Sequence, residues 1–169
     1  MTKYLLDANI FIQAKNLHYG FDFCPAFWDW LKEQNAIGKL ASIEKVADEL
    51  YAGEDELSNW AEERGDIFFL KANEKVLPAL AEVSTWANSQ NYQPSAISTF
   101  LQGADYWLIA HAKAYGWTVV THEKPENSQK KIKIPNACIG LTINFVNVYQ
   151  MLRRERARFI LGHQQSSAL

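Results

Sequence analysis

Short apolar segments alternate with helical segments from one end of the chain to the other. Two of the apolar segments, residues 3–7 and 117–121, have the composition of buried parallel strands, and glycines end several of the helical segments. A chain that alternates strands and helices folds as an α/β layer structure around a mostly parallel sheet. In such sheets ligands bind beyond the carboxyl ends of the strands, so the polar residues that follow the strands are the first candidates for a site.

The remaining elements are placed by hydrophobic periodicity, caps and glycine stops. A helix is expected to open at Pro25, and a helix or turn begins at Asn9. Ser42 is the expected N-cap of the next helix, because its hydroxyl oxygen can accept a hydrogen bond from the first turn. Five further helices are expected over residues 43–52, 55–64, 73–88, 104–115 and 142–161. Three further strands are expected at residues 39–41, 67–70 and 132–134.

The length of 169 residues indicates one domain, with residues 1–161 folded and residues 162–169 forming a frayed polar tail. Asp7 comes too early for the apolar stretch of a signal peptide, and no apolar run is long enough to cross a membrane. Cys24 and Cys138 lack the spacing of a zinc site and are expected to be reduced thiols. We therefore expect a cytoplasmic protein that does not contact a membrane.

Basic residues are concentrated in one part of the chain. The whole chain has a net charge of −2, but residues 124–158 carry +6, from eight basic residues and two acids. This asymmetry predicts an anionic partner such as a nucleic acid, and a solvated basic face explains it equally well. The eight candidate nucleic-acid-binding residues are Lys124, Lys130, Lys131, Lys133, Arg153, Arg154, Arg156 and Arg158.

Four acidic residues stand where an open α/β site would be built. Asp7 ends the first strand, Glu123 follows the strand over residues 117–121, Glu49 flanks the apolar stripe of its helix, and Asp105 begins a helix. Taken singly, each can be a helix cap, a helix-dipole contact or a surface acid. Together they form the oxygen ligand set that Mg²⁺ or Mn²⁺ requires, and a divalent ion held this way can activate water for phosphodiester cleavage.

In order and local sequence these positions resemble the PIN domain, the nuclease fold of VapC-like bacterial toxins. The matching segments are LLDAN at residues 5–9, VADELYAG at 46–53, DYWLIAHA at 105–112 and GWTVVTHE at 116–123. The resemblance implies a three-layer α/β/α domain with a mostly parallel sheet of about four to five strands. It also implies the roles of individual residues. The resemblance implies that Asp7, Glu49 and Asp105 bind metal. It implies that Glu123 occupies the place of a fourth acid, which in the family is usually Asp. Asn9 and Thr121 match supporting polar positions.

The resemblance further implies a metal-dependent endoribonuclease that uses Mg²⁺ or Mn²⁺. It implies the toxin of a toxin–antitoxin pair, blocked by a cognate antitoxin protein and forming a homodimer. His122 precedes the fourth acid and is a candidate substrate contact rather than the general base.

Several alternatives remain open at this point. The same site could cleave DNA, or the fold could be a non-catalytic protein-interaction module that uses some of the six Trp residues. A phosphatase of the haloacid type needs a second Asp where this chain has Asn9. A nucleotide-binding fold needs a glycine-rich phosphate loop, which the sequence lacks.

Overall fold

A computed structural model describes residues 1–162 of the chain. A tail was expected over residues 162–169, and all of it except residue 162 lies outside the described part. Five parallel strands form one sheet in the order β3-β2-β1-β4-β5. The central strand β1 pairs through Tyr4 with Leu40 on one side and with Thr118 on the other. The strands are β1 (Tyr4–Leu6), β2 (Leu40–Ile43), β3 (Phe69–Leu70), β4 (Thr118–Val120) and β5 (Phe145–Val146).

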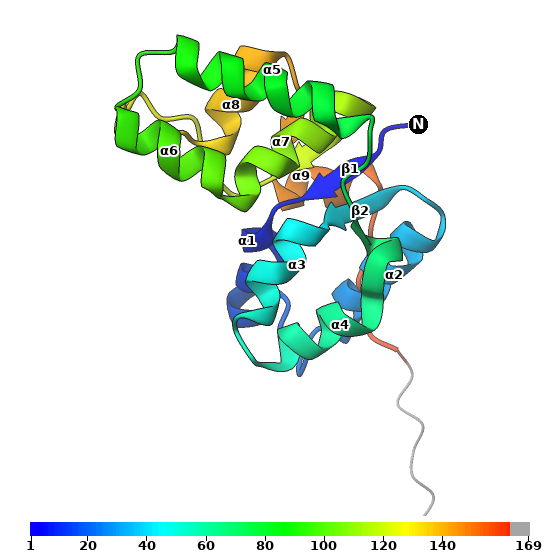
Figure 1. The fold of residues 1–169 in the computed structure, drawn as a ribbon. Helices are drawn as coiled ribbons and strands as arrows, with labels where there is room; N and C mark the ends of the chain where they lie inside the picture. The colour runs from blue at the N-terminus through cyan, green and yellow to red at the C-terminus, as the bar shows by residue number, and fades with distance from the viewer. Residues whose placement is uncertain (163–169) are drawn as a thin grey trace, which may run out of the picture.

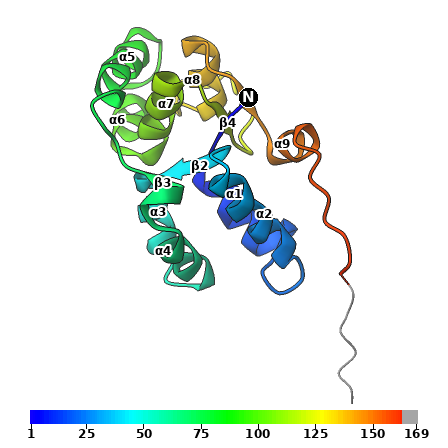
Figure 2. The ribbon, with the colours of Figure 1, turned by 90° about the vertical axis from the view of Figure 1, so that its right-hand side faces the viewer.

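Helices cover both faces of the sheet, and Figures 1 and 2 show them as two layers. The segments before and after β3 lie on opposite faces because parallel strands are joined by right-handed crossovers, and the strand order reverses direction after β3. The first layer holds α1 (Ala8–Gln13) with its π-helical continuation η1 (Ala14–His18), α2 (Pro25–Ala36), α3 (Glu44–Tyr51) and α4 (Glu56–Phe68). The second layer holds α5 (Val76–Ser89), α6 (Pro94–Gln102), α7 (Ala104–Tyr115) and α8 (Ile134–Leu141). The expected three-layer α/β/α fold is confirmed.

Packing against the sheet explains the apolar runs of the sequence. Every residue of β1 and β4 is buried, because helices cover both faces of these strands.

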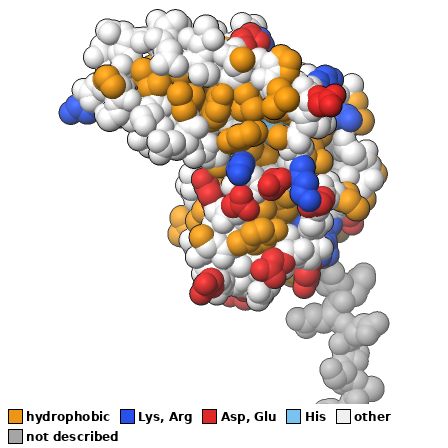
Figure 3. All heavy atoms as spheres, viewed as in Figure 1, with side chains coloured by type: hydrophobic (Ala, Val, Ile, Leu, Met, Phe, Trp, Pro, Cys, Tyr) orange, Lys and Arg blue, Asp and Glu red, His pale blue; other side chains and the backbone are white. Residues whose placement is uncertain are grey.

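Within the second layer, the Trp86 ring of α5 lies against Gly140 of α8, where a Cβ atom would stand 2.2 Å from Trp86 Nε1. On the face drawn in Figure 3, charged side chains gather over α3 and α4, whereas a band of apolar side chains lies over α5 and α7.

Two of the expected helix boundaries need correction in the first half of the chain. Ser42 is not a helix cap: it lies in β2, and its Oγ donates a hydrogen bond of 2.6 Å to the carbonyl oxygen of Leu6. The helix expected over residues 55–64 begins after Asp55, which caps it by accepting from the Ser58 amide, and runs past a kink at Gly65 to Phe68.

The C-terminal third departs most from expectation. Residues 132–134 form no strand, and Ile134 instead begins α8. The helix expected over residues 142–161 is interrupted at its start, because Thr142 adopts a left-handed conformation with φ of 58° and β5 follows. Only α9 (Val148–Arg154) is helical, and it begins with a capping box formed by Asn147 and Gln150. The sequence also did not indicate α6.

Two expectations about the chain's environment can be compared with the described residues. Cys24 and Cys138 are both free thiols, and Cys138 is buried. Among residues 1–162, no helix combines the length and the apolar character needed to cross a membrane.

Candidate functional site

Asp7 occupies the carboxyl end of the central strand and is only 3 % exposed. Its backbone amide donates to the carbonyl oxygen of Val120 at 3.0 Å, which fixes it against β4. Asp7 stands at the N-cap position of α1, but its side chain makes no capping hydrogen bond there. Helix capping therefore does not explain why this carboxylate is buried.

A single buried hydroxyl joins two of the four acids. Thr121, which is 1 % exposed, donates from Oγ1 to Asp7 Oδ2 at 3.0 Å. The same Oγ1 accepts a hydrogen bond of 3.1 Å from the backbone amide of Glu123. Thr121 thus orients the Asp7 carboxylate and at the same time fixes the start of the loop that carries Glu123.

The other two acids come from helices of opposite layers. Glu49 belongs to α3, and Asp105 lies in the first turn of α7. Both line one cavity of about 410 Å³, whose wall includes Lys130 and Lys131. Figure 3 shows the molecule hollowed at this place, between α6 and α3.

The pKa of Asp7 reflects its burial among other acids. Burial, which is the largest cause, and the negative charges of Asp105 and Glu123 together raise the pKa to about 7. The hydrogen bond from Thr121 works in the opposite direction, because it stabilises the charged carboxylate. Without a cation, Asp7 is therefore a carboxylate that its surroundings tend to protonate.

The pKa of Asp105 is raised for the same reasons, but nearby lysines lower it. Burial is the largest cause that raises it, the charges of Glu123 and Glu49 act in the same direction, and Lys131 and Lys133 lower it, with a resulting value of about 6. Desolvation also raises the pKa of Glu49. Acids that repel one another in this way form a local negative field that favours a bound cation.

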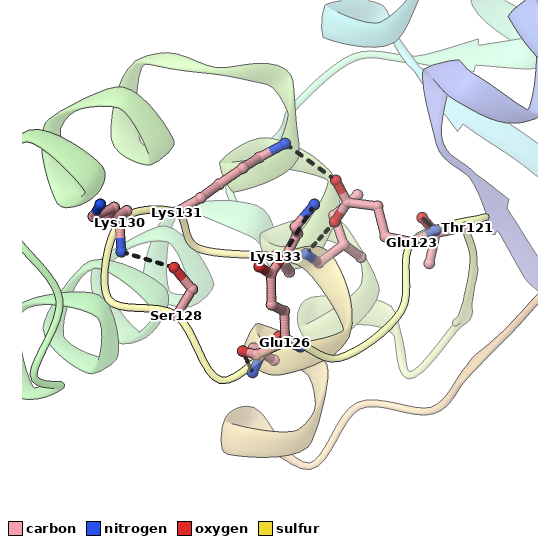
Figure 4. Close-up of polar contacts among 9 residues, drawn as sticks. Thr121, Glu123, Glu126, Ser128, Lys130, Lys131 and Lys133 are labelled. Carbon is pink, nitrogen blue, oxygen red and sulfur yellow. Dashed lines mark hydrogen bonds and ion pairs between the residues drawn. The ribbon is translucent and has the colours of Figure 1, made fainter.

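Glu123 has hydrogen-bonding partners of its own. Figure 4 shows its carboxylate between two donors: Oε2 accepts from the backbone amide of Ile134 at 2.8 Å, and Oε1 lies 3.5 Å from Lys131 Nζ. The first of these contacts places a negative charge at the N-terminus of α8, where the helix dipole stabilises it. Glu123 therefore helps to fix α8 and the lysine-bearing loop besides adding charge to the site.

The donor set fits a hard divalent cation in chemistry. All four acids offer oxygen, which Mg²⁺ and Mn²⁺ prefer, and Mg²⁺ in proteins uses one or two carboxylates and keeps several waters. The acids affect one another in pairs: the charges of Asp105 and Glu123 raise the pKa of Asp7, and those of Glu123 and Glu49 raise the pKa of Asp105. Within residues 1–162, however, no three acidic, histidine or cysteine side chains converge closely enough to ligate one ion. The residue types fit, and the side chains as placed do not form a closed ligand shell.

The remaining candidate residues fall into two groups. Asn9 is exposed in the first turn of α1, two residues beyond Asp7. In the loop before α8, the side chain of Lys133 lies 3.7 Å from Glu126, and Lys124 is exposed near the loop's start. With Lys130 and Lys131, the lysines therefore lie on the loop that follows β4 and carries Glu123 (Figure 4).

The four arginines are placed differently. Arg153 and Arg154 end α9, and Arg156 and Arg158 follow it. Glu155, among them, accepts hydrogen bonds from the Tyr4 hydroxyl at 2.8 Å and from Lys39. Because Tyr4 begins β1 and Lys39 precedes β2, Glu155, the residue after α9, lies at the edge where the strands begin, opposite the acids. The structure does not bring all eight basic residues together.

Three aromatic side chains meet at the loop after β4, and only His122 among them was expected near the site from the sequence. The ring centroid of His122 lies 5.9 Å from that of His18 and 6.2 Å from that of Tyr149. His18 and Tyr149 are 5.8 Å apart in an edge-to-face arrangement. Burial and the neighbouring His18 lower the pKa of His122. The three residues come from distant segments, so no local sequence signal predicts that they meet.

Comparison with known proteins yields a family match and a shared fold. The family model described as a domain of unknown function, DUF4411, matches residues 4–159. A search of curated proteins gives no match. Among solved structures, VapBC2 from Rickettsia felis, bound to a DNA fragment from its promoter, is 21 % identical with a TM-score of 0.52. That match covers 86 % of this chain and 98 % of the other.

Two further solved structures have the same fold. FitAcB from Neisseria gonorrhoeae is 19 % identical with a TM-score of 0.52, and the match covers 86 % of this chain and 98 % of that one. FitAB bound to the IR36 DNA fragment is 18 % identical with a TM-score of 0.52, over 95 % and 99 % of the two chains. At these identities the likeness establishes the fold, and the expected PIN-like architecture is confirmed.

Proposed function

The chain belongs to the DUF4411 family, and from this premise and its site we propose that it is a metal-dependent endoribonuclease. The observation that carries the proposal is the buried Asp7 carboxylate at the carboxyl end of the central strand. Burial and the charges of Asp105 and Glu123 raise its pKa, so the charged form needs a compensating cation. A buried acid that caps no helix and is surrounded by other acids is well explained as a metal ligand.

In this proposal Asp7, Glu49 and Asp105 hold one or two Mg²⁺ or Mn²⁺ ions, and Glu123 assists from the adjoining loop. A bound ion of this kind lowers the pKa of a coordinated water and neutralises charge on the phosphate. Thr121 holds the Asp7 carboxylate in position through its 3.0 Å hydrogen bond, and Asn9 lies close enough in sequence to orient a ligand or water.

The lysines of the loop would bind the substrate backbone. Lys130 and Lys131 line the same cavity as Glu49 and Asp105, so a phosphate held there lies beside the acids. Lys131 is 3.5 Å from Glu123, a weak pairing for an exposed lysine, and can exchange this partner for a phosphate. We include the four arginines in the proposed nucleic-acid-binding set. Their contribution to RNA affinity depends on how far the bound RNA extends around the protein.

We further propose that the enzyme is the toxin of a bacterial toxin–antitoxin pair. The support is the family resemblance to VapC-like toxins, together with a fold shared with VapBC2 and FitAB, whose solved structures are bound to DNA fragments. The partner on this proposal is a cognate antitoxin protein that blocks the acidic site, and the toxin forms a homodimer.

The decisive experiment is a cleavage assay on pooled RNA and on DNA, with Mn²⁺ or with EDTA. Asp7→Asn removes one charge from the site, and Asp48→Asn removes one from the exposed side of α3 next to Glu49. We expect wild type and Asp48→Asn to cleave RNA only with the metal. We expect Asp7→Asn to lose at least about a hundredfold in rate, because even residues that only support metal ligands cost 10- to 100-fold when they are removed. Expression of the wild type alone should arrest growth, whereas Asp7→Asn should not.

Other outcomes have definite meanings. Metal-dependent cleavage of DNA but not of RNA would replace the ribonuclease proposal by a DNA nuclease on the same acids. Equal behaviour of wild type and Asp7→Asn, with no Mn²⁺ binding in calorimetry, would sink the nuclease proposal. That result would favour a protein-interaction module.

A further inference from the structure

An aromatic cluster with an exposed edge includes His122, the residue between Thr121 and Glu123, and the proposed chemistry does not use it. The cluster consists of His18 at the end of η1, His122 in the loop after β4, and Tyr149 in the first turn of α9. Ring centroids are 5.8 to 6.2 Å apart in each of the three pairs. His18 is exposed, and the other two rings are half-buried. We call these three residues the aromatic platform.

The platform rests on a packed aromatic base. Tyr19, which adjoins His18, stacks on Phe27 of α2 with ring centroids 4.4 Å apart and planes inclined by 12°. Phe159 packs edge-on against Tyr19 at 5.8 Å, and the indole Nε1 of Trp28 donates to the Tyr19 carbonyl oxygen at 2.7 Å. His18 itself lies 6.3 Å from Tyr19 between centroids. A surface ring supported in this way is preorganised and loses little conformational entropy when a ligand binds.

The platform and the cavity are built from different residues. His122 stands between Thr121, which holds Asp7, and Glu123. The cavity of about 410 Å³ is lined by Asp105 and Glu49 and shares no residue with the platform. An RNA strand bound at the acids can therefore extend toward the lysines of the cavity or, past His122, toward the exposed rings.

The charge beside the platform is positive. Arg153 follows Tyr149 by four residues on α9, so the two side chains share one face of that helix. Arg153 is exposed, and the acid that follows on the same segment, Glu155, is engaged by Tyr4 and Lys39 at the opposite edge of the sheet. Aromatic rings with an adjacent arginine are the combination that proteins use to hold unpaired nucleotides.

We propose that the aromatic platform binds an unpaired base of single-stranded RNA next to the phosphodiester at the acids, with Arg153 contacting a neighbouring phosphate. This inference rests on the proposed function, because it takes the acids to be the cleavage site. It specifies the substrate class: a single strand supplies bases that can leave the stack, whereas the bases of a duplex cannot reach a surface ring. Stacking tolerates any base, so the platform gives strand selectivity without sequence selectivity.

The test measures binding in EDTA, where the proposed chemistry cannot proceed, with two fluorescent oligoribonucleotides. One has a normal mixed sequence and the other is abasic at every position. We expect His18→Ala and Tyr149→Ala each to weaken binding of the normal strand about tenfold, a typical stacking contribution, and to leave the abasic strand nearly unchanged. Tyr149→Phe keeps the ring and should bind like wild type. Tyr92→Ala, which removes a partly buried tyrosine packed against Trp86 of α5, is the matched control.

The outcomes separate this inference from the function on which it rests. Normal RNA cleavage with Mn²⁺ together with unchanged binding by both alanine variants would overturn the platform and leave the nuclease. Wild type that neither cleaves nor binds RNA would overturn both. An equal loss for normal and abasic strands would also overturn the platform, because it would show a contact to the backbone and not to a base. His18 is exposed, so His18→Ala tests the proposal even if Tyr149→Ala unfolds the chain.

Discussion

Asp7 links the chemistry of the site to the stability of the fold. Its pKa is about 7 in the folded chain and near 3.8 when the residue is in water. The folded state therefore holds more protons than the unfolded state between these values. Under that condition the free energy of unfolding falls as pH rises through the window from about 4 to 7. Asp105, with a pKa of about 6, acts in the same direction.

We therefore predict that the metal-free protein is less stable at pH 8 than at pH 5. Asp7→Asn should flatten this dependence and be the more stable protein at pH 8, by a few kcal/mol at most, since one pKa unit corresponds to about 1.4 kcal/mol. Urea unfolding in EDTA at several pH values measures the effect, with Asp48→Asn as the control that keeps the wild-type slope. Parallel slopes for wild type and Asp7→Asn would refute it. Added Mn²⁺ should stabilise the wild type at pH 8 and not Asp7→Asn.

Single residues of the site differ in how far the sequence predicted them. Asp7 and Glu49 could be singled out because one follows an apolar strand and the other flanks an apolar helical stripe. The contact between Glu123 and the Ile134 amide could not, because it depends on where α8 begins, eleven residues later. Ser42 was misassigned because a serine hydroxyl can cap a helix or bond to a neighbouring strand, and only the packing of β1 beside β2 decides between them.

Among the elements, the packing of α5 on α8 is the most sharply defined. Gly140 lies within α8, where alanine would favour the helix by about 1 kcal/mol. The close approach of Trp86 leaves no room for the added methyl group. We predict that Gly140→Ala lowers the free energy of unfolding by about 1–3 kcal/mol, the usual cost of overpacking.

A double-mutant cycle with Trp86→Leu tests this explanation. Removing the indole makes room for the methyl group, so Gly140→Ala should cost much less, or even stabilise, in the Trp86→Leu background. Thermal and urea unfolding of the four proteins supply the energies. Additive effects of the two substitutions would contradict the proposed packing.

The elements that the sequence failed to indicate are short or lack a periodic signal. Strand β5 has two residues, too few for any alternation to show, and it exists because Val119 and Val120 of β4 offer it a parallel partner. The long helix expected over residues 142–161 does not form as one element. It fails because Thr142 turns left-handed and Arg156 does so again, with φ of 54°. By contrast, the stop at Gly116 was predicted correctly, and that residue ends α7 with φ of 67°.

On the scale of the whole molecule, basic side chains that are close in sequence lie at opposite edges of the sheet. Neutralising Lys130 and Lys131 together should reduce the dependence of RNA affinity on salt by about one unit of slope for each phosphate that the protein no longer neutralises. Arg156→Gln with Arg158→Gln removes the same charge from the segment that follows α9 and should reduce the slope less, because Glu155 of that segment is bound at the edge where the strands begin. Titrations between 50 and 200 mM salt compare the two pairs. Equal reductions would mean that RNA wraps around the molecule.

The sheet order also determines when the site can come into existence during synthesis. Asp7 leaves the ribosome well before Thr121, which orients its carboxylate and is made 114 residues later. Strand β1 has no partner on that side until β4 has emerged, and Glu155, which binds Tyr4, follows later still. On the proposed function, a growing chain that has not reached β4 lacks the hydroxyl that orients Asp7, and we expect it not to cut RNA near the ribosome that makes it. We expect the proposed activity to begin only after the second half of the sheet has formed.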